Sequence, residues 1–523
     1  LGEIPQALTT YLTHAKATEG QDFDLLQQVG RSLLEQGAGD SDPEIQLMSL
    51  FGAGVALSPQ LLPVLEKGIR SKEIKSQLVA LNFLGHYDDD VADQLLMEAL
   101  SSPFLLPRLE ACFQLAQKKN PIVVDHVAAL YYKVPDMVHT LFPQIIVHID
   151  TESANQIMQQ YLCDQDFQVR VEALLHIAKQ KRDDFLPQIH KLASQTHFAL
   201  QEASALCFAE MQDRSAIPLL QYLTQSKQED LSLVALFSLH LLGESSAEEQ
   251  ILARAEGLNL FAITALGKVE TKKSRELLYT LLDNRDRDVQ LNAALSLLAQ
   301  RDPKCLPFLE TMIIKGTKDI GFYRKTTPAG AIGAWKAVSS ATQKEKNLIG
   351  LAQASAGLKG VILTSALELP EENFLQLARL IFEKQETILI PPLIDLLVNH
   401  RSANSIALLK EMQQKTGAPY IRNYCNLALF QLGEKGPYEQ NLVDWIKKEQ
   451  DKMLISFKEE RSKERESQFT LTAEETSQFL INAFETLCSA QSLTGIETLI
   501  QAIAYGNPKN RYALAGLLIR TTE

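Results

Sequence analysis

The stretch Asp166-Phe-Gln-Val-Arg-Val-Glu-Ala-Leu-Leu-His-Ile-Ala178 decides how the rest of the chain is interpreted. Its apolar residues, among them Val169, Ala173 and Ile177, recur at steps of three and four, which places them on one face of a helix. The stretch Asp286-Arg-Asp-Val-Gln-Leu-Asn-Ala-Ala-Leu-Ser-Leu-Leu298 repeats this spacing 120 residues later. An amphipathic helix with a small residue on its apolar face predicts a neighbouring helix packed closely against it.

Small residues return at the same helical position along much of the chain. The gaps between successive positions are 30, 32, 27 and 31 residues for the set Ala173, Ala203, Ala235, Ala262 and Ala293. An earlier set, Ser49, Ala80 and Ala111, has gaps of 31 residues. A period near 31 that contains only helix signals is typical of stacked helical hairpins, since one hairpin cannot bury its apolar face alone. The sequence therefore predicts an all-α fold, an α-solenoid of antiparallel helical hairpins.

The pattern divides the chain into five expected segments. They are a repeat array at 1–310, an irregular basic and glycine-bearing segment or decayed repeat at 311–370, further repeats at 371–446, a charged helix or linker at 447–470, and a helical cap at 471–523. The uncharged run 45–65 has the length of a membrane span, but it contains Pro59 and Pro63. Two buried helices that meet near Pro59 explain it better, so we expect no transmembrane segment.

The charge of the chain is negative and unevenly distributed. The 523 residues carry a net charge of −13, and 22% are charged while 46% are hydrophobic. Residues 1–150 contain 19 Asp and Glu against 10 Lys and Arg, whereas residues 301–470 contain 20 against 24. A net negative charge disfavours general binding to nucleic acid or to anionic lipid. A protein partner, basic where it meets the acidic first half, fits the charge better.

The six cysteines are far apart and form no CxxC pair. Cys112, Cys207 and Cys425 lie near the small-residue positions, where cysteine acts as a small apolar side chain. We expect packing in the core rather than a disulfide framework or a metal site, which favours the cytoplasm. Because the first residue is Leu1, a targeting segment could precede the sequence, and a secreted or periplasmic location stays open.

The pattern Asp-x-x-Val-Arg-x-x-Ala-Leu-x-x-Leu/Ile resembles HEAT repeats, in particular the short HEAT-like units of phycobilisome lyases. The first stretch matches it at the positions Asp166, Val169, Arg170, Ala173, Leu174 and Ile177, and the second matches it in part, from Asp286 onward. The resemblance implies that Asp166, Arg170 and Asp286 belong to a ladder that ties neighbouring repeats. Most members of the family act as scaffolds or adaptors, and a minority act as lyases or DNA-repair glycosylases.

The segment 315–336 is where the repeat pattern stops, and it supplies the candidate binding residues. Its basic and aromatic side chains are Lys315, Lys318, Tyr323, Arg324, Lys325 and Trp335. Such a combination suits an interaction with anionic groups and flat rings, although an irregular connection with Trp335 packed in the core would look the same. Pro328 is expected to open a helix that holds Trp335.

No motif of catalysis or phosphate binding is present in the sequence. It contains no HExxH, no GxxxxGK[ST], no GxSxG and no GxGxxG, and the ten histidines form no pair with metal-ligand spacing. We therefore expect no catalytic residue, no cofactor and no metal. The leading hypothesis is a non-enzymatic protein-interaction scaffold. The alternatives are a HEAT-like enzyme or nucleic-acid-binding protein, of the chromophore lyase or DNA glycosylase type, and an assembly factor of the cell envelope or a secreted one.

Overall fold

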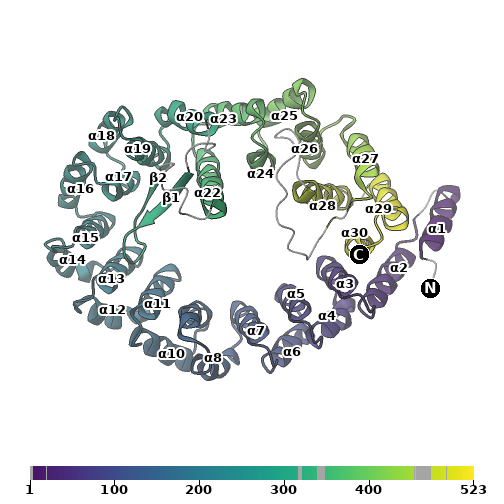
Figure 1. Cartoon of the computed structure of the whole chain (residues 1–523), viewed down its shortest axis with the longest axis horizontal. Helices are drawn as coiled ribbons and strands as arrows, with labels where there is room; N and C mark the ends of the chain where they lie inside the picture. Colours follow the sequence, from purple (N-terminus) through teal and green to yellow (C-terminus); the bar gives the residue numbers. More distant parts are fainter. Residues whose placement is uncertain are drawn as a thin grey trace. The chain divides into compact units, whose positions relative to one another are not determined.

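The computed structural model describes residues 4–18, 21–315, 321–338, 348–452, 454, 473–490 and 492–523 (Figure 1). In these residues the chain is all-α apart from one two-stranded hairpin, and consecutive helices pair into antiparallel hairpins that stack on one another. The expected α-solenoid architecture is confirmed. The chain forms two compact units, one from residues 1–126 together with 397–523, and one from residues 127–396.

The first unit contains both ends of the chain. Its helices are α1 (Ile4–Thr18), α2 (Phe23–Gly37), α3 (Pro43–Ala56), α4 (Leu62–Ile69), α5 (Ile74–Leu84), α6 (Asp90–Ala99), α7 (Leu105–Gln117), α25 (Ala403–Lys415), α26 (Pro419–Gln431), α27 (Tyr438–Glu449), α28 (Ala473–Ser489), α29 (Leu493–Tyr505) and α30 (Asn510–Thr522). Helices α8 (Val123–Tyr131) and α24 (Ile390–His400) cross the unit boundaries. The uncharged run 45–65 falls on α3 and α4, with a short 3₁₀ turn between them. Among the described residues no helix has the length and apolarity needed to cross a membrane.

The second unit contains the most regular repeats. Its elements are α9 (Phe142–Ile146), α10 (Glu152–Leu162), α11 (Phe167–Lys179), α12 (Leu186–Ala193), α13 (Phe198–Glu210), α14 (Ile217–Leu223), α15 (Glu229–Leu241), α16 (Ser246–Glu256), α17 (Leu260–Ala265), α18 (Lys272–Leu282), α19 (Arg287–Ala299), α20 (Leu306–Lys315), β1 (Gly321–Thr326), β2 (Gly333–Val338), α22 (Leu348–Ala366) and α23 (Glu371–Lys384). In Figure 1, α13, α15, α17 and α19 form the inner row of this unit, and α12, α14, α16 and α18 form the outer row.

The small residues identified in the sequence lie where the inner helices touch. Ala173, Ala203, Ala235, Ala262 and Ala293 are all fully buried. Helix α13 packs against α11 and α15, and α19 packs against α17, so each helix contacts its neighbours in the row. The small side chains let the backbones approach, and leucines fill the space between them.

In the first unit, helices from the two ends of the sequence pack on each other. Helix α30 lies against α2 and α3, and α29 lies against α1, as the purple and yellow helices of Figure 1 show. At the contact of α3 with α30, a Cβ atom on Gly516 would lie 2.0 Å from the carbonyl oxygen of Gly52. Glycine at both positions therefore permits a backbone separation that no other residue would allow.

One expectation for the segment after α20 is wrong. Pro328 does not open a helix, and Trp335 lies in strand β2. Strands β1 and β2 are antiparallel, and Arg324 lies opposite Trp335. The division of the chain into the five predicted segments stays a prediction, and most of the charged segment 447–470 lies outside the described residues.

Candidate protein-binding site

The hairpin β1–β2 lies within the second unit and turns tightly at residues 327–332. The amide of Thr327 donates to the carbonyl of Ile332 at 3.0 Å, and the amide of Gly330 donates to the carbonyl of Thr327 at 2.8 Å. Gly330 has φ of +78°, a left-handed conformation that glycine adopts without strain. The turn therefore forms from residues 327–332 themselves, and its position on the unit depends on contacts with the inner helices.

Glu202 of α13 holds the turn. Its carboxylate accepts hydrogen bonds from the hydroxyl of Thr327 and from the amide of Ala331, the latter at 3.3 Å. The side chain is only 1% exposed, and this burial raises the pKa of the Glu202 carboxyl, while the hydrogen bonds from the turn act in the opposite direction. A buried carboxylate without donors would be costly, so the turn and Glu202 stabilise each other.

Helix α19 covers the outer edge of strand β2. The side-chain amide of Asn292 donates to the carbonyl of Trp335 at 2.8 Å and accepts from the amide of Trp335 at 2.9 Å. Two residues further along β2, the amide of Ala337 donates to the carboxylate of Asp288 at 2.7 Å. These side chains take the place of a third strand, so the edge is not left with unpaired amides. Together with Glu202 they fix the hairpin backbone at three points.

The strands of the hairpin also carry basic and aromatic side chains. We call this set the hairpin surface: Tyr323, Arg324, Lys325, Trp335 and Lys336. Arg324 and Lys325 are exposed, and the other three are partly exposed. In the register, Tyr323 lies opposite Lys336 and Arg324 lies opposite Trp335. Because side chains alternate between faces along a strand, one face carries Tyr323 with Lys325 and Lys336, and the other carries Trp335 with Arg324.

No carboxylate among the described residues pairs with a cation of the hairpin surface. In the described part of the chain, Arg324, Lys325 and Lys336 take part in none of the ion pairs within 4.0 Å. The Lys325 ammonium lies 5.7 Å from the centre of the Phe261 ring. The Arg324 side chain lies over Gly333, where an added Cβ would come within 2.3 Å of its Nε atom. The hairpin surface is therefore positively charged and open to an anionic group.

The structure brings four of the six predicted binding residues together, namely Tyr323, Arg324, Lys325 and Trp335. Lys315 ends α20, and Lys318 lies outside the described residues. Sequence reasoning did not single out Lys336 or the anchors Glu202, Asp288 and Asn292. Two of these anchors had a signal in the sequence, because Glu202 and Asn292 each lie one residue before a small-residue position on a buried helix face.

The predicted repeat ladder is placed as follows. Asp166 and Asp286 cap the first turns of α11 and α19, since their carboxylates accept from the amides of Gln168 and Asp288, both at 2.8 Å. Arg170 reaches the following hairpin, where its guanidinium donates to the side chain of Gln195 at 3.2 Å. A ladder that joins these residues along the stack stays a prediction.

One cluster has the composition of a hydrolytic triad but not its geometry. His190 Nε2 lies 2.7 Å from a carboxylate oxygen of Asp213 and 3.3 Å from the hydroxyl of Ser215. In a relay, the carboxylate and the hydroxyl meet opposite nitrogens of the ring, whereas here both meet Nε2. The Asp213 carboxylate also accepts from the Ser215 amide at 3.0 Å, which is the arrangement of a helix cap.

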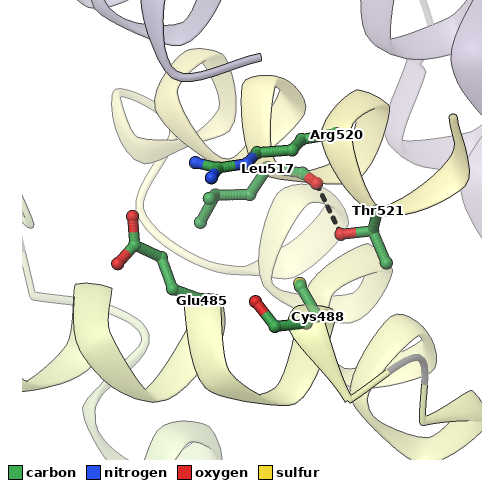
Figure 2. Close-up of a pocket in the computed structure, with 6 residues that line it drawn as sticks. Glu485, Cys488, Leu517, Arg520 and Thr521 are labelled. Atoms are coloured by element: carbon green, nitrogen blue, oxygen red, sulfur yellow. Dashed lines mark hydrogen bonds between the residues drawn. The ribbon is translucent and has the colours of Figure 1, made fainter. Parts of the chain in front are cut away.

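A hollow of about 460 Å³ lies between α28 and α30 (Figure 2). Glu485, Cys488 and Arg520 line it, and the Thr521 hydroxyl donates to the carbonyl of Leu517 at 2.6 Å. Burial raises the pKa of the Cys488 thiol to about 11, so it stays protonated near neutral pH and is a poor nucleophile. In the part of the chain that the structure describes, no group of three or more metal-ligating side chains comes together.

No family model and no curated protein matches the chain. Among solved structures, an engineered protein has 14% identity and a TM-score of 0.27, with 78% of this chain and 100% of that chain covered. A homology model of the full-length AP-3 complex in an intermediate open conformation has 12% identity and a TM-score of 0.32, with 96% and 90% covered. The Kap95:Nup1 complex has 12% identity and a TM-score of 0.26, with 93% and 73% covered. Likeness at this level gives no information on function.

Proposed function

We propose that the chain is a non-enzymatic protein-interaction scaffold whose hairpin surface docks an acidic segment of a protein partner. The observation that supports this most directly is the contrast between the anchored backbone of the hairpin and the cations on its strands. Its backbone is tied to α13 and α19 by the buried Glu202 and Asn292 and by the partly exposed Asp288. The three cations of the hairpin surface have no carboxylate within ion-pairing distance among the described residues. A rigid support with uncompensated charges on it is organised before the partner arrives, which lowers the cost of binding.

The side chains of the hairpin surface favour a protein over a nucleic acid. Lys336 and Arg324 lie opposite rings in the register, and Lys325 lies near the ring of Phe261. A partner that alternates carboxylates with apolar side chains would therefore contact both kinds of group. The described residues of the hairpin gather three cations, and the chain as a whole carries a charge of −13, which would repel a long phosphate backbone.

Two finer parts of the proposal come from the sequence. The repeats belong to the short HEAT-like type that the residues around Asp166 resemble. The chain works in a reducing compartment such as the cytoplasm, which is supported by free cysteines, since Cys112, Cys207, Cys305, Cys425 and Cys488 are buried and unpaired. A basic partner for the acidic first half remains part of the proposal and is developed below.

Fluorescence anisotropy with two labelled probes tests the docking role. One probe is a peptide of three Glu-Glu-Phe repeats, and the other is a nine-nucleotide thymidine strand. The variant Arg324→Ala/Lys325→Ala/Lys336→Ala removes the charges of the hairpin surface. We expect it to bind the peptide about 5- to 100-fold more weakly, because three screened charges contribute about 0.3–1 kcal/mol each.

The control is Lys272→Ala/Lys273→Ala/Arg287→Ala, which removes the same charge from exposed positions of α18 and α19. It should bind the peptide as the unchanged chain does. Equal peptide affinity in all three proteins would contradict the proposal. Tighter binding of the thymidine strand, lost in the hairpin variant alone, would assign the hairpin surface to nucleic acid instead.

A further inference from the structure

A second site lies at the end of α8, where the repeat pattern of the second unit is least regular. A hollow of about 30 Å³ is lined by Tyr131, Tyr132, Ile157, Gln160, Tyr161 and Asp164. A space of this size holds one group as large as a water molecule or an ammonium. Its walls are unusual for so small a hollow, because three of the side chains are tyrosines and one is a carboxylate.

The three rings are arranged around one another. The centres of Tyr131 and Tyr132 are 5.6 Å apart with the rings nearly perpendicular, and those of Tyr131 and Tyr161 are 5.0 Å apart. Tyr131 and Tyr161 are buried, whereas Tyr132 is 82% exposed. The rings of Tyr131 and Tyr161 are therefore held by packing, whereas the ring of Tyr132 is accessible to a ligand.

The carboxylate of the hollow has only neutral partners. Asp164 accepts from the Tyr131 hydroxyl at 2.6 Å and from the amide of Asp166 at 2.9 Å. Burial, followed by the bond to Asp164, raises the pKa of the Tyr131 hydroxyl, so it stays a neutral donor. In the described part of the chain, Asp164 is in no ion pair within 4.0 Å, and Asp166 adds a second negative charge beside it.

The surroundings of the hollow have the same sign of charge. Residues 122–166 contain six Asp and Glu against a single Lys or Arg, Lys133. The most exposed large apolar side chains of the described residues are here as well, since Met137 is 84% exposed and lies five residues after Tyr132. Arg182 pairs with Asp150 at 3.4 Å, and the other carboxylates still leave an excess of negative charge here. Exposed apolar groups beside excess negative charge fit a basic segment that also carries apolar side chains.

We infer that this hollow binds the ammonium group of a lysine from a basic protein segment. The rings of Tyr132 and Tyr161 would offer their negative faces to the cation, and Asp164 would offer its charge. The small volume of the hollow suits the compact ammonium of lysine better than the broader, planar guanidinium of arginine. The inference rests on the proposed scaffold function, but it uses no residue of the hairpin surface. Lysine binding at the hollow and binding of an acidic peptide at the hairpin surface can therefore fail independently, and each is measured with its own peptide.

Anisotropy with a labelled peptide of alternating Lys and Leu provides the test, with the same peptide carrying acetylated lysines as the uncharged probe. We expect Tyr132→Ala and Asp164→Asn each to weaken binding of the lysine peptide by about 3- to 30-fold, in the range of one cation–ring or charge contact. Tyr132→Phe keeps the ring and should bind as the unchanged chain does. Tyr222→Ala is the control, because Tyr222 of α14 is 73% exposed and lies outside the hollow.

Four outcomes would overturn the inference. The acetylated peptide could bind as tightly as the lysine peptide, which would show that charge is not recognised. Tyr222→Ala could weaken binding as much as Tyr132→Ala, which would show that the peptide binds without using the hollow. Free butylammonium could fail to displace the lysine peptide in a competition measurement, which would show that the hollow does not bind an ammonium group. Free butylammonium could also bind as tightly as the peptide does, which would assign the hollow to a small amine instead. Circular dichroism of each variant checks that folding is retained.

Discussion

Glu202 and Asn292 occupy equivalent places in two helices of the inner row, each one residue before a small-residue position. Both are 1% exposed, and both direct their polar groups to the hairpin. The equivalent residue of α17 is Phe261, whose ring lies near the ammonium of Lys325. One helical position thus supplies a carboxylate, an amide and a ring to the same hairpin. The residue type at this position therefore determines which kind of contact each inner helix makes with the hairpin.

Glu202→Gln should change how stability depends on pH. Burial raises the pKa of the Glu202 carboxyl above its ordinary value of 4.5, so between these two pKa values the folded chain holds more protons than the unfolded chain. Its contribution to stability therefore falls as the pH rises through that window. We expect the free energy of unfolding of the unchanged chain, relative to that of Glu202→Gln, to decrease from about pH 4.5 upward. The total decrease is about 1.4 kcal/mol for each tenfold difference between the proton affinities of Glu202 in the folded and unfolded chains.

Urea denaturation followed by Trp335 fluorescence would measure this, in a Trp445→Phe background that leaves one tryptophan. Glu210→Gln changes an exposed glutamate of the same helix and serves as the control. Stability curves of the unchanged chain and Glu202→Gln that run parallel from pH 4 to pH 8 would refute the assignment of Glu202 as a buried carboxylate under the turn.

At the scale of elements, helices could be predicted and the hairpin could not. A helix of this chain shows its apolar face within a dozen residues, as Val169, Ala173 and Ile177 do, so local periodicity finds it. The hairpin depends on partners 43 residues away at Asn292 and 125 residues away at Glu202. Contacts over such sequence distances produce no repeating pattern in the sequence. Local signals alone therefore predicted a helix start at Pro328, where the chain makes a turn. The sequence located the basic and aromatic side chains, but not the anchors that orient them.

Asn292→Ala should loosen β2 without unfolding the unit. The substitution removes the donor and the acceptor that serve Trp335 and leaves two backbone groups unpaired, at a cost of about 1–3 kcal/mol for each group that stays buried. Hydrogen exchange at the amides of Trp335 and Ala337 should accelerate, while exchange in α11 and α15 stays as it is. Asn284→Ala, which removes a side chain from the loop before α19, should leave the hairpin unchanged. Unaltered exchange at Trp335 in Asn292→Ala would show that α19 is not what holds the strand.

At the scale of the whole molecule, the first unit depends on a contact that joins the two ends of the sequence. Stacking of consecutive hairpins follows from the repeat period, because each hairpin must cover the next. The pairing of α30 with α2 and α3 does not follow from it. Hydrogen bonds accompany this pairing, since the side chain of Gln27 donates to the carbonyl of Thr522 at 2.7 Å. The last helix therefore covers apolar surface of the first ones, including Leu34, which is fully buried.

Gly516→Ala should weaken this contact selectively. The added Cβ would lie 2.0 Å from the oxygen of Gly52 and 2.7 Å from its carbonyl carbon, and because both are backbone atoms the helices must move apart. Overpacking of this kind costs about 1–3 kcal/mol or more. Gly360→Ala is the matched control, since a Cβ there meets nothing within 4 Å in the interior of α22 and alanine should stabilise that helix by about 0.5–1 kcal/mol. Hydrogen exchange in α3 and α30 should accelerate in Gly516→Ala and not in Gly360→Ala. Equal protection of both helices in the two variants would mean that the ends of the chain are not held together at Gly52, and that each end is stable without the other.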